Sequence, residues 1–233
     1  MSVAPNRWIE DLPRDRPIAE FSVWSADLVR LAEDLGRVDP HVDILHIDVA
    51  DGHFSPAMLL FPDLVAGVRK VSSRPIHVHL MVADSIILSQ IEQFADAGAD
   101  LISIHVENEG VAERALDLLD RRGVATGMVL KVDTPVGRVK PYIPRLRFVT
   151  LLGTAIGVKG QGLNEKAGDR LLEARRLIEE AGVTQRVILA ADGGIREHTV
   201  PVLRQSGAET VVLGSLAFNA PSLEERMMWL RAL

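Results

Sequence analysis

Two histidines and two aspartates stand at or just after the ends of three apolar segments of this chain. His46 and Asp48 alternate in the first segment, His79 ends the second, and Asp192 follows the third. Side chains two residues apart in a strand point to the same face, so His46 and Asp48 are expected side by side. Two imidazoles and two carboxylates suit one divalent metal ion, and such a mixed site accepts zinc, iron, manganese or cobalt.

Glycine-rich segments supply a second chemical signal. Gly193 and Gly194 follow the third apolar segment, and Gly214 and Ser215 follow the last one. Backbone N–H groups left open by glycine bind phosphate, and in α/β barrels the loops after strands seven and eight often do so. These four residues are therefore the predicted phosphate site. Residues 153–162 form a longer glycine-rich loop that we predict to be a mobile lid over the substrate.

The elements that must position these groups alternate along the chain. Short apolar runs alternate with amphipathic segments, which is typical of repeated βα units around a parallel sheet. Eight such units predict a closed (β/α)8 TIM barrel in a single domain. Strands are predicted at Ile18–Val23, Ile44–Val49, Ile76–Leu80, Leu101–His105, Ala125–Leu130, Phe148–Leu152, Val187–Ala190 and Thr210–Leu213. Helices are predicted at Asp27–Leu35, Pro62–Val71, Ile86–Ala97, Val111–Arg121, Val136–Tyr142, Glu165–Ala181, Thr199–Ser206 and Ser222–Leu233.

In a (β/α)8 barrel, a metal ligand is expected at the carboxyl end of the strand that carries it. Catalytic groups of such barrels lie at the carboxyl ends of the strands, and all four candidates meet this condition. His77 shares a face with His79 but lies one layer deeper, so it is predicted to pack or to support the site instead of binding the metal. Residues 1–16 are expected to form an arm on the barrel exterior, and residues 17–233 the catalytic barrel.

Composition narrows the class of partner. The formal net charge is -6 and the chain has no block of Lys or Arg, so no nucleic-acid partner is expected. The absence of cysteine excludes thiolate nucleophiles and sulfur-ligated metals and fits a reducing cytoplasm. No signal peptide and no membrane span are evident in the sequence. We therefore expect a cytoplasmic protein that acts on a small molecule.

The ordered motifs of this chain resemble those of the ribulose-phosphate 3-epimerase family over nearly the whole length after residue 17. The resemblance is carried by residues 22–27, 46–54, 77–81, 105–107, 192–195 and 214–215.

The resemblance implies an isomerase, a metal-dependent epimerase that interconverts D-ribulose 5-phosphate and D-xylulose 5-phosphate at C3. It assigns the metal to His46, Asp48, His79 and Asp192. Of these, Asp48 and Asp192 would also be the acid–base pair. It also implies that Ser22, Met81 and Gln161 contact the sugar phosphate and that the protein is a homo-oligomer. The chemistry agrees, because epimerisation beside a ketone needs a base on one face of a planar enediolate and an acid on the other.

The chain departs from the family pattern on the substrate side. Ala50 and Leu152 stand where the family has methionine, and Lys131 stands where it often has asparagine. The loop motif Asn-Pro-Gly-Phe-Gly-Gly-Gln becomes residues 155–161 here, so Lys159 replaces a glycine. The metal and acid–base residues are intact, which favours the same reaction type, and the departures concern the residues expected around the sugar.

Four alternatives stay open at this point. A four- or six-carbon ketose phosphate could be the substrate of an epimerase or isomerase with the same site. Lys131 could form a Schiff base in a class I aldolase. A related decarboxylase barrel is disfavoured because Ala50 occupies the position of its lysine. The barrel could also bind a sugar phosphate without turnover.

Overall fold

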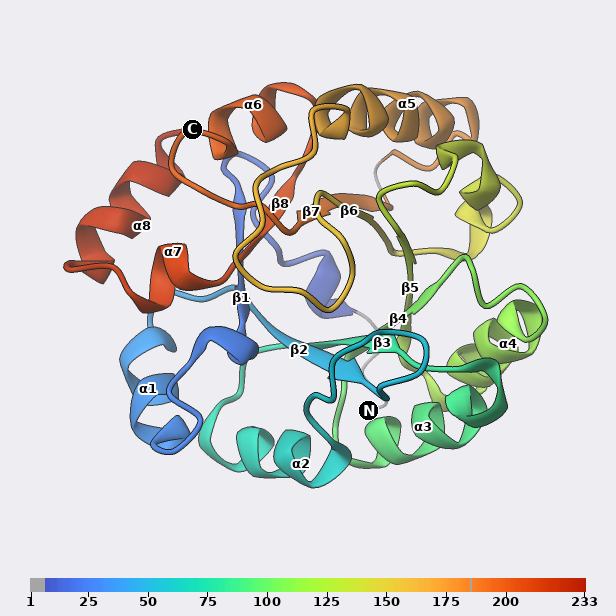
Figure 1. The fold of residues 1–233 in the computed structure, drawn as a ribbon, viewed down its shortest axis with the longest axis horizontal. Helices are drawn as coiled ribbons and strands as arrows, with labels where there is room; N and C mark the ends of the chain where they lie inside the picture. The colour runs from blue at the N-terminus through green and yellow to red at the C-terminus, as the bar shows by residue number, and fades with distance from the viewer. Residues whose placement is uncertain (1–6, 185) are drawn as a thin grey trace.

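The eight strands of the described residues close into a barrel. The computed structural model describes residues 7–184 and 186–233, and its strands pair in parallel in sequence order, with β8 returning to β1 (Figure 1). The predicted (β/α)8 barrel is therefore confirmed. The strands are β1 (Ile18–Ser22), β2 (Ile44–Ala50), β3 (Ile76–Met81), β4 (Leu101–His105), β5 (Ala125–Leu130), β6 (Phe148–Leu152), β7 (Ile188–Asp192) and β8 (Thr210–Leu213). Asp192 is thus the last residue of β7 and does not follow the strand as predicted.

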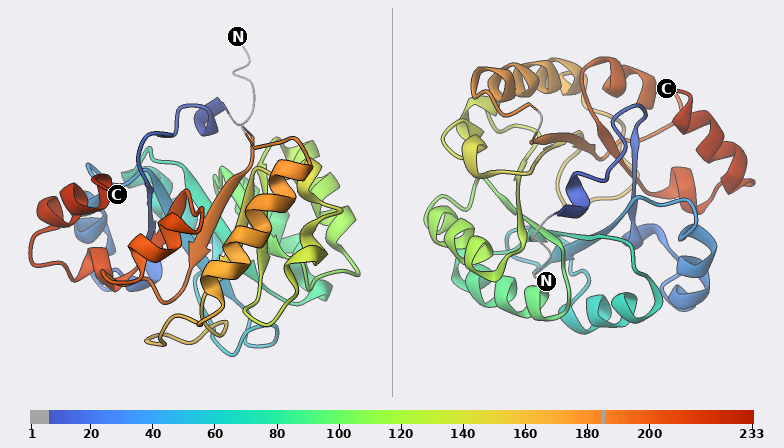
Figure 2. Two further views of the ribbon diagram at one scale, coloured as in Figure 1. Left: turned by 90° about the horizontal axis from the view of Figure 1, so that it is seen from above. Right: turned by 180° about the vertical axis from the view of Figure 1, so that it is seen from behind.

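Helices surround the barrel on its outer side (Figures 1 and 2). The α-helices are α1 (Leu31–Val38), α2 (Pro62–Val71), α3 (Asp84–Asp96), α4 (Ala112–Arg122), α5 (Ala167–Glu180), α6 (Val200–Gln205), α7 (Ser215–Phe218) and α8 (Leu223–Arg231). Short 3-10 helices are η1 (Arg7–Ile9), η2 (Val23–Ser25), η3 (Val136–Val139) and η4 (Ile143–Arg145). No helix among the described residues is long and apolar enough to span a membrane.

Two predicted helices are wrong in detail. The first begins at Leu31 and not at Asp27, because the Asp27 carboxylate accepts a hydrogen bond from the backbone N–H of Val29 and holds a turn there. In place of the predicted helix Val136–Tyr142 the structure has the 3-10 helix η3 at Val136–Val139, and the second 3-10 helix η4 begins only at Ile143. Pro141 lies within the predicted range and lacks an N–H donor, so an α-helix could not continue through it. The short helix α7 was not predicted.

Strand alternation divides the strands into an apolar outer face and an inner face that carries polar side chains above an apolar layer at the amino end. Phe21 and Ile47 are fully buried in the layer between strands and helices. Glu20 and His46 alternate with them and are also fully buried, so they belong to the barrel interior. In the parallel register of β2 and β3, His46 pairs with His77 and Asp48 with His79. The register therefore brings three imidazoles and a carboxylate into neighbouring positions of the interior.

The amino end of the barrel is closed by the segment that precedes β1. Ile9 and Leu12 are buried in one cluster with interior residues that include Phe148, and the Trp8 ring lies 6.5 Å from the Phe148 ring. Figure 2 shows η1 over this end of the barrel. The arm was expected on the barrel exterior; its described part covers the amino end, while residues 1–6 lie outside the described residues. The opposite end remains available for the site.

Candidate active site and metal centre

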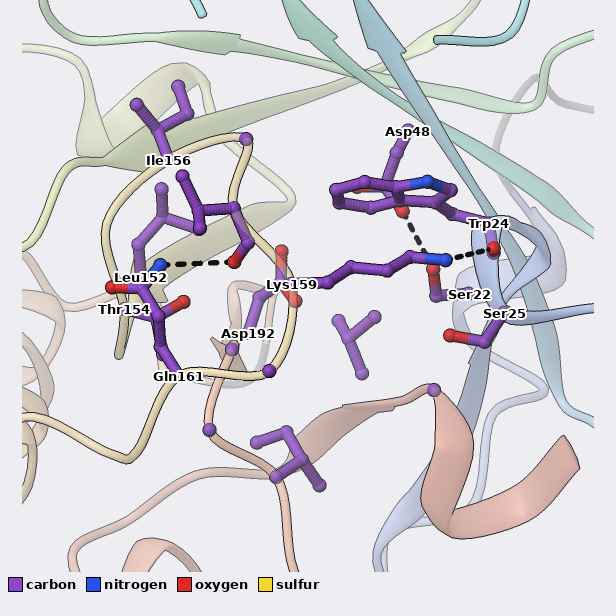
Figure 3. A pocket seen from close by; sticks show the side chains of 18 of the residues that line it. Ser22, Trp24, Ser25, Asp48, Leu152, Thr154, Ile156, Lys159, Gln161 and Asp192 are labelled. Atoms are coloured by element: carbon purple, nitrogen blue, oxygen red, sulfur yellow. Dashed lines mark hydrogen bonds between the residues drawn. The ribbon is translucent and has the colours of Figure 1, made fainter. Parts of the chain in front are cut away.

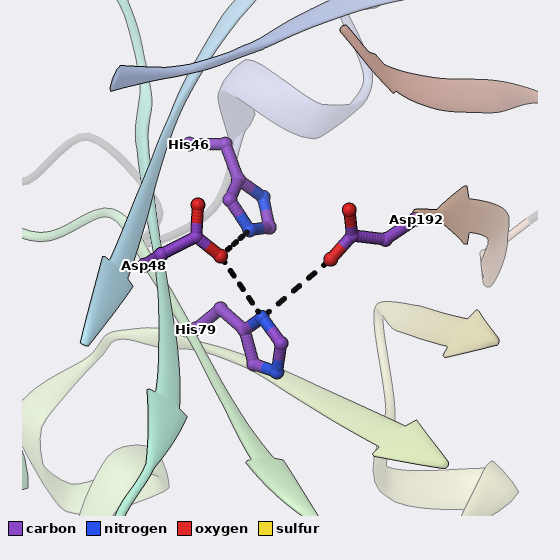
Figure 4. A group of neighbouring side chains, drawn as sticks. All are labelled: His46, Asp48, His79 and Asp192. Atoms are coloured by element: carbon purple, nitrogen blue, oxygen red, sulfur yellow. Dashed lines mark ion pairs between the residues drawn. The ribbon is translucent and has the colours of Figure 1, made fainter. Parts of the chain in front are cut away.

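The four predicted metal ligands meet at the carboxyl end of the barrel (Figure 4). His46 Nε2 lies 3.3 Å from Asp48 Oδ1, and His79 Nδ1 lies 3.4 Å from the same oxygen. Asp192 Oδ2 approaches from β7 to 3.7 Å from His79 Nδ1. One ligand atom from each residue falls within 4.8 Å of every other. Three strands thus bring together the set predicted from their sequence spacing.

The donor atoms fit a small divalent cation. His46 Nε2 and His79 Nδ1 are buried and have no hydrogen-bond partner among the described residues. A buried polar atom without a partner is costly, and a metal ion would satisfy both. Ligand atoms about 2.1 Å from a tetrahedral ion lie about 3.4 Å apart, which matches the separations in the cluster. The residues therefore could hold one divalent ion.

Glu20 supports this cluster from one layer deeper in the interior. Its Oε1 accepts hydrogen bonds from His46 Nδ1 at 2.7 Å and from His77 Nδ1 at 2.5 Å, and all three side chains are fully buried. With Nδ1 of His46 protonated, its Nε2 lone pair faces the cluster. His77 contacts Ser103 through Nε2 at 2.6 Å, in the supporting position that was predicted.

The role of Glu20 was missed in the sequence, although a signal existed. Glu20 is a carboxylate two residues before Ser22 within an apolar strand, so alternation places both on the inner face. A charged residue in such a position needs a buried partner. The partners come from β2 and β3, which only the barrel closure brings next to β1.

Charges inside the cluster shift the ionisation of its members. Burial raises the pKa of Glu20, but His77 and His46 outweigh it and hold the pKa below its ordinary value. Burial likewise raises the pKa of Asp48, and the charge of His46 overcomes this effect and lowers it. Burial lowers the pKa of His46, yet Asp48 and Glu20 raise it well above its usual value. Without a metal ion, the proton that His46 retains offsets part of the negative charge of Glu20 and Asp48.

Asp192 ionises differently from Asp48. Burial, partly offset by the charge of His46 and reinforced by that of Asp48, raises the pKa of Asp192 to about 6. Its side chain is 18% exposed, against 8% for Asp48. The two carboxyl groups thus differ in proton affinity, which is the property expected of an acid and a base that share a site.

The affinity for zinc is expected to fall as the pH decreases through about 6. A ligand must lose its proton to bind a metal ion: His46, whose pKa lies well above its usual value, loses one already at neutral pH, and below its pKa of about 6 Asp192 must lose a second. One displaced proton weakens the apparent affinity about tenfold per pH unit. Competition with a chromophoric chelator between about pH 5 and about pH 8 measures this dependence. A constant affinity over that range, after correction for the chelator's own protonation, would contradict it.

A cavity of about 390 Å³ opens directly above the cluster (Figure 3). Asp48, His79 and Asp192 form part of its floor, and the loop 153–161 that follows β6 covers it. The structure places nearly all of the predicted site residues around it; His46 lies beneath the floor and does not line the cavity. Those that line it are Ser22, Asp48, His79, Met81, Gln161, Asp192, Gly193, Gly194, Gly214 and Ser215.

The three predicted substrate-contacting side chains differ in their local bonding. Ser22 Oγ donates a hydrogen bond to Asp48 Oδ2 at 2.7 Å, so it orients a candidate catalytic carboxylate. Met81 lines the cavity and is 2% exposed. The Gln161 amide donates to the Ala155 and Val158 carbonyls of its own loop, at 3.2 and 3.0 Å. In this arrangement the amide nitrogen of Gln161 stabilises the loop.

The glycines after β7 are required by their surroundings. Gly193 and Gly194 have φ of 87° and 70°, which side-chain-bearing residues rarely adopt. A Cβ on Gly194 would lie 2.7 Å from the Leu163 Cα, so the backbone just after the loop 153–162 packs directly on this turn. Gly214 and Ser215 line the same cavity from the end of β8. The four residues predicted to bind phosphate therefore line the same cavity as Asp48, His79 and Asp192.

Lys159 was not predicted as a site residue. It lines the cavity, its ammonium donates to the Trp24 carbonyl at 2.6 Å, and it lies 4.5 Å from the centre of the Trp24 ring (Figure 3). Burial lowers its pKa, while Asp48 acts in the opposite direction. The signal was present in the sequence as the replacement of a loop glycine by lysine. Its position over the cavity depends on how the loop folds back onto η2.

Comparisons with known proteins identify the family. The profile of the Ribulose-phosphate 3 epimerase family matches residues 18–218. The ribulose-phosphate 3-epimerase of Bacillus subtilis is 33% identical over 199 residues, covering 85% of this chain and 90% of that protein. Ribulose-phosphate 3-epimerase 1 of Cupriavidus necator is 34% identical over 207 residues, covering 87% of this chain and 85% of that protein. The crystal structure of 3-hexulose-6-phosphate synthase shares the fold alone, with a TM-score of 0.64, 19% identity and coverage of 93% of this chain and 96% of that chain. With its closed barrel and its buried His/Asp cluster, this chain belongs to the ribulose-phosphate 3-epimerase family and is an isomerase of the epimerase class.

Proposed function

We propose that this protein interconverts D-ribulose 5-phosphate and D-xylulose 5-phosphate by epimerisation at C3, with one divalent metal ion bound. The observation that carries the proposal is the convergence of Asp48 from β2 and Asp192 from β7 on one centre (Figure 4). The two strands are separated by β1 and β8, so their carboxylates enter the cavity from different sides. A planar intermediate between them would present one face to each.

Proton transfer follows from this placement. One aspartate removes the proton at C3 of the ketose, and the other returns a proton to the opposite face of the planar enediolate. Without a bound ion, burial raises the pKa of Asp192 to about 6 while the charge of His46 lowers that of Asp48, so the two carboxyl groups differ in proton affinity. Ser22 holds Asp48 by a hydrogen bond at 2.7 Å. A bound divalent ion would supply positive charge that stabilises the developing oxyanion.

The phosphate of the substrate would anchor the other end of the sugar. Gly193, Gly194, Gly214 and Ser215 line the cavity at the ends of β7 and β8, where such barrels commonly bind phosphate. Binding energy at this remote group fixes the reacting carbon between the carboxylates. The ligand class is thus a short ketose phosphate, with a four- or six-carbon sugar as the alternative.

Two other reactions find less support in the site. The Lys131 ammonium lies 3.7 Å from the centre of the Phe54 ring, and Lys131 is not among the described residues that line the cavity, which disfavours a Schiff base. Ala50, at the end of β2, offers no cation for a decarboxylase. A barrel that binds sugar phosphate without turnover would retain the cavity but would not need two carboxylates at one centre.

Solvent exchange tests the proposed function directly. The zinc-loaded protein is incubated in deuterated water with D-ribulose 5-phosphate, and NMR follows deuterium at C3 together with formation of the xylulose epimer. Both are expected. Four- and six-carbon ketose phosphates are run in parallel, and faster turnover of one of these would reassign the substrate. Binding without exchange in any of them would identify a non-catalytic barrel.

Replacing Lys159 by methionine is expected to raise KM for the ketose phosphate about tenfold, with kcat changed by less than about threefold. Methionine keeps much of the apolar length of the side chain but removes the ammonium that bonds to Trp24 and faces the cavity. A tenfold change corresponds to about 1.4 kcal/mol of binding. Steady-state kinetics measure it, with Lys166→Met as the matched control outside the cavity. Unchanged kinetics would remove Lys159 from substrate binding.

A further inference from the structure

Two side chains, the buried His105 and the partly buried Glu107, extend from the proposed metal ligand His79 on the side away from the other ligands. His79 Nε2 lies 2.8 Å from His105 Nε2, and His105 Nδ1 lies 3.0 Å from Glu107 Oε2. The ring centres of the two histidines are 5.0 Å apart and their planes differ by 24°. With the nitrogens 2.8 Å apart, the nearly coplanar rings meet edge to edge through one hydrogen bond. This geometry leaves His79 Nδ1 as the atom that faces the ligand cluster.

The direction of each hydrogen bond follows from the chemistry of its ends. An ionised Glu107 can only accept, so His105 Nδ1 must carry the proton. Neutral His105 then has an acceptor at Nε2, and His79 Nε2 must donate to it. His79 consequently carries its proton on Nε2 and keeps the lone pair on Nδ1. That atom is the buried nitrogen without a partner, 3.4 Å from Asp48 Oδ1.

The surroundings fix Glu107 as the acceptor. Its Oε1 receives hydrogen bonds from the backbone N–H of Lys131 at 3.1 Å and from the hydroxyl of Thr134. Burial raises the pKa of Glu107, but the bonds from His105 and Thr134 prevail and lower it to about 2. The His105 side chain is fully buried, and burial disfavours the charged form of an imidazole, so one of its two ring nitrogens is left as an acceptor. The Phe54 ring contacts the His105 ring, with 4.9 Å between the ring centres.

From this chain of contacts we propose that His105 and Glu107 are positioning residues that set the tautomer of His79 and thereby raise the affinity of the site for its divalent ion. The inference rests on the metal site of the proposed function. Without the acceptor at His105, the His79 proton can move to Nδ1 or its ring can turn, and either change removes a ligand atom from the cluster. Loss of such an outer hydrogen bond typically weakens metal binding 10- to 100-fold.

Substitutions at position 105 separate this role from simple packing. The side-chain amide of glutamine reaches the position of imidazole Nε2, whereas that of asparagine reaches only the position of Nδ1. His105→Gln can still accept from His79 and is expected to bind zinc within about threefold of the wild-type protein. His105→Asn and the similarly sized His105→Phe are expected to bind it about 10- to 100-fold more weakly, and Glu107→Gln about tenfold more weakly. His198→Asn, at an exposed histidine, is the control.

Two readouts test the inference independently of turnover. Zinc affinity is measured by competition with a chromophoric chelator, and thermal melting in excess chelator shows which metal-free variants are folded. Long-range proton–nitrogen NMR spectra of the metal-free wild-type protein, labelled at histidine, report the His79 tautomer and need no variant. The expected form carries the proton on Nε2, and His105→Phe should change it.

Several outcomes would overturn the inference. They are a His79 proton on Nδ1 in the wild-type protein, wild-type zinc affinity in His105→Phe, or equal loss in His105→Gln and His105→Asn. A wild-type protein that binds zinc and shows the expected tautomer, but does not epimerise any ketose phosphate, would refute the proposed function and leave the inference intact.

Discussion

Asp192→Asn is expected to lower kcat for epimerisation by a thousandfold or more, and Asp48→Asn by a similar factor. Removing a positioned acid or base typically costs about 10²- to 10⁴-fold, and each aspartate is also a candidate metal ligand. Asparagine has nearly the same size and leaves the strand ends in place, so both variants should remain folded. Residual activity then reports the chemistry and not the stability of the barrel.

Deuterium exchange distinguishes the two carboxylates. If each serves one face, Asp192→Asn should exchange deuterium into one epimer of the substrate only, and Asp48→Asn into the other only. Zinc content, measured on the same samples, separates loss of the base from loss of the metal. Asp96→Asn is the control, because this exposed aspartate forms a surface ion pair with Arg122. Wild-type rates in either active-site variant would refute the acid–base assignment.

Removal of the metal ion is expected to abolish turnover, and its return to restore it. The metal-free cluster leaves His46 Nε2 and His79 Nδ1 buried without hydrogen-bond partners, with the Asp48 carboxylate beside them. Without a bound cation, protonated imidazole is the positive charge that the described side chains of the cavity floor can offer to the developing oxyanion, because the Lys159 ammonium is held on Trp24 by the loop. Because an imidazolium nitrogen is a weaker and differently placed electrophile, the enediolate should form too slowly to detect.

The experiment uses the purified protein dialysed against a chelator and then supplied separately with zinc, iron(II), manganese(II) or cobalt(II). The mixed nitrogen and oxygen ligands should accept each of them, with different rates. A metal ion at about 100 times its dissociation constant should also stabilise the fold by about 2.7 kcal/mol, seen as a higher Tm. If the metal-free protein turned over the substrate as fast as the zinc-loaded protein, a catalytic metal ion would be excluded.

The barrel and the four candidate ligands could be predicted from local patterns. Alternation along β2 is a property of consecutive residues, so the placement of His46 and Asp48 on one face needed no knowledge of other strands. Parallel strands in sequence order put their carboxyl ends on one rim, which was enough to bring His79 and Asp192 to the same site. The helix bounds were predicted less accurately: at residues 136–142 the structure has the 3-10 helix η3 and then Pro141, where an α-helix was predicted.

The supporting contacts could not be predicted in this way, because they join residues whose partners are chosen by barrel closure and loop packing. Glu20 on β1 contacts imidazoles of β2 and β3, and His105 on β4 meets His79 through one particular pair of ring nitrogens. Lys159 reaches the cavity only because its loop folds back onto Trp24. Strand periodicity defines which face a side chain occupies; hydrogen-bond direction, tautomer and loop position depend on distances of a few ångströms between segments far apart in the chain.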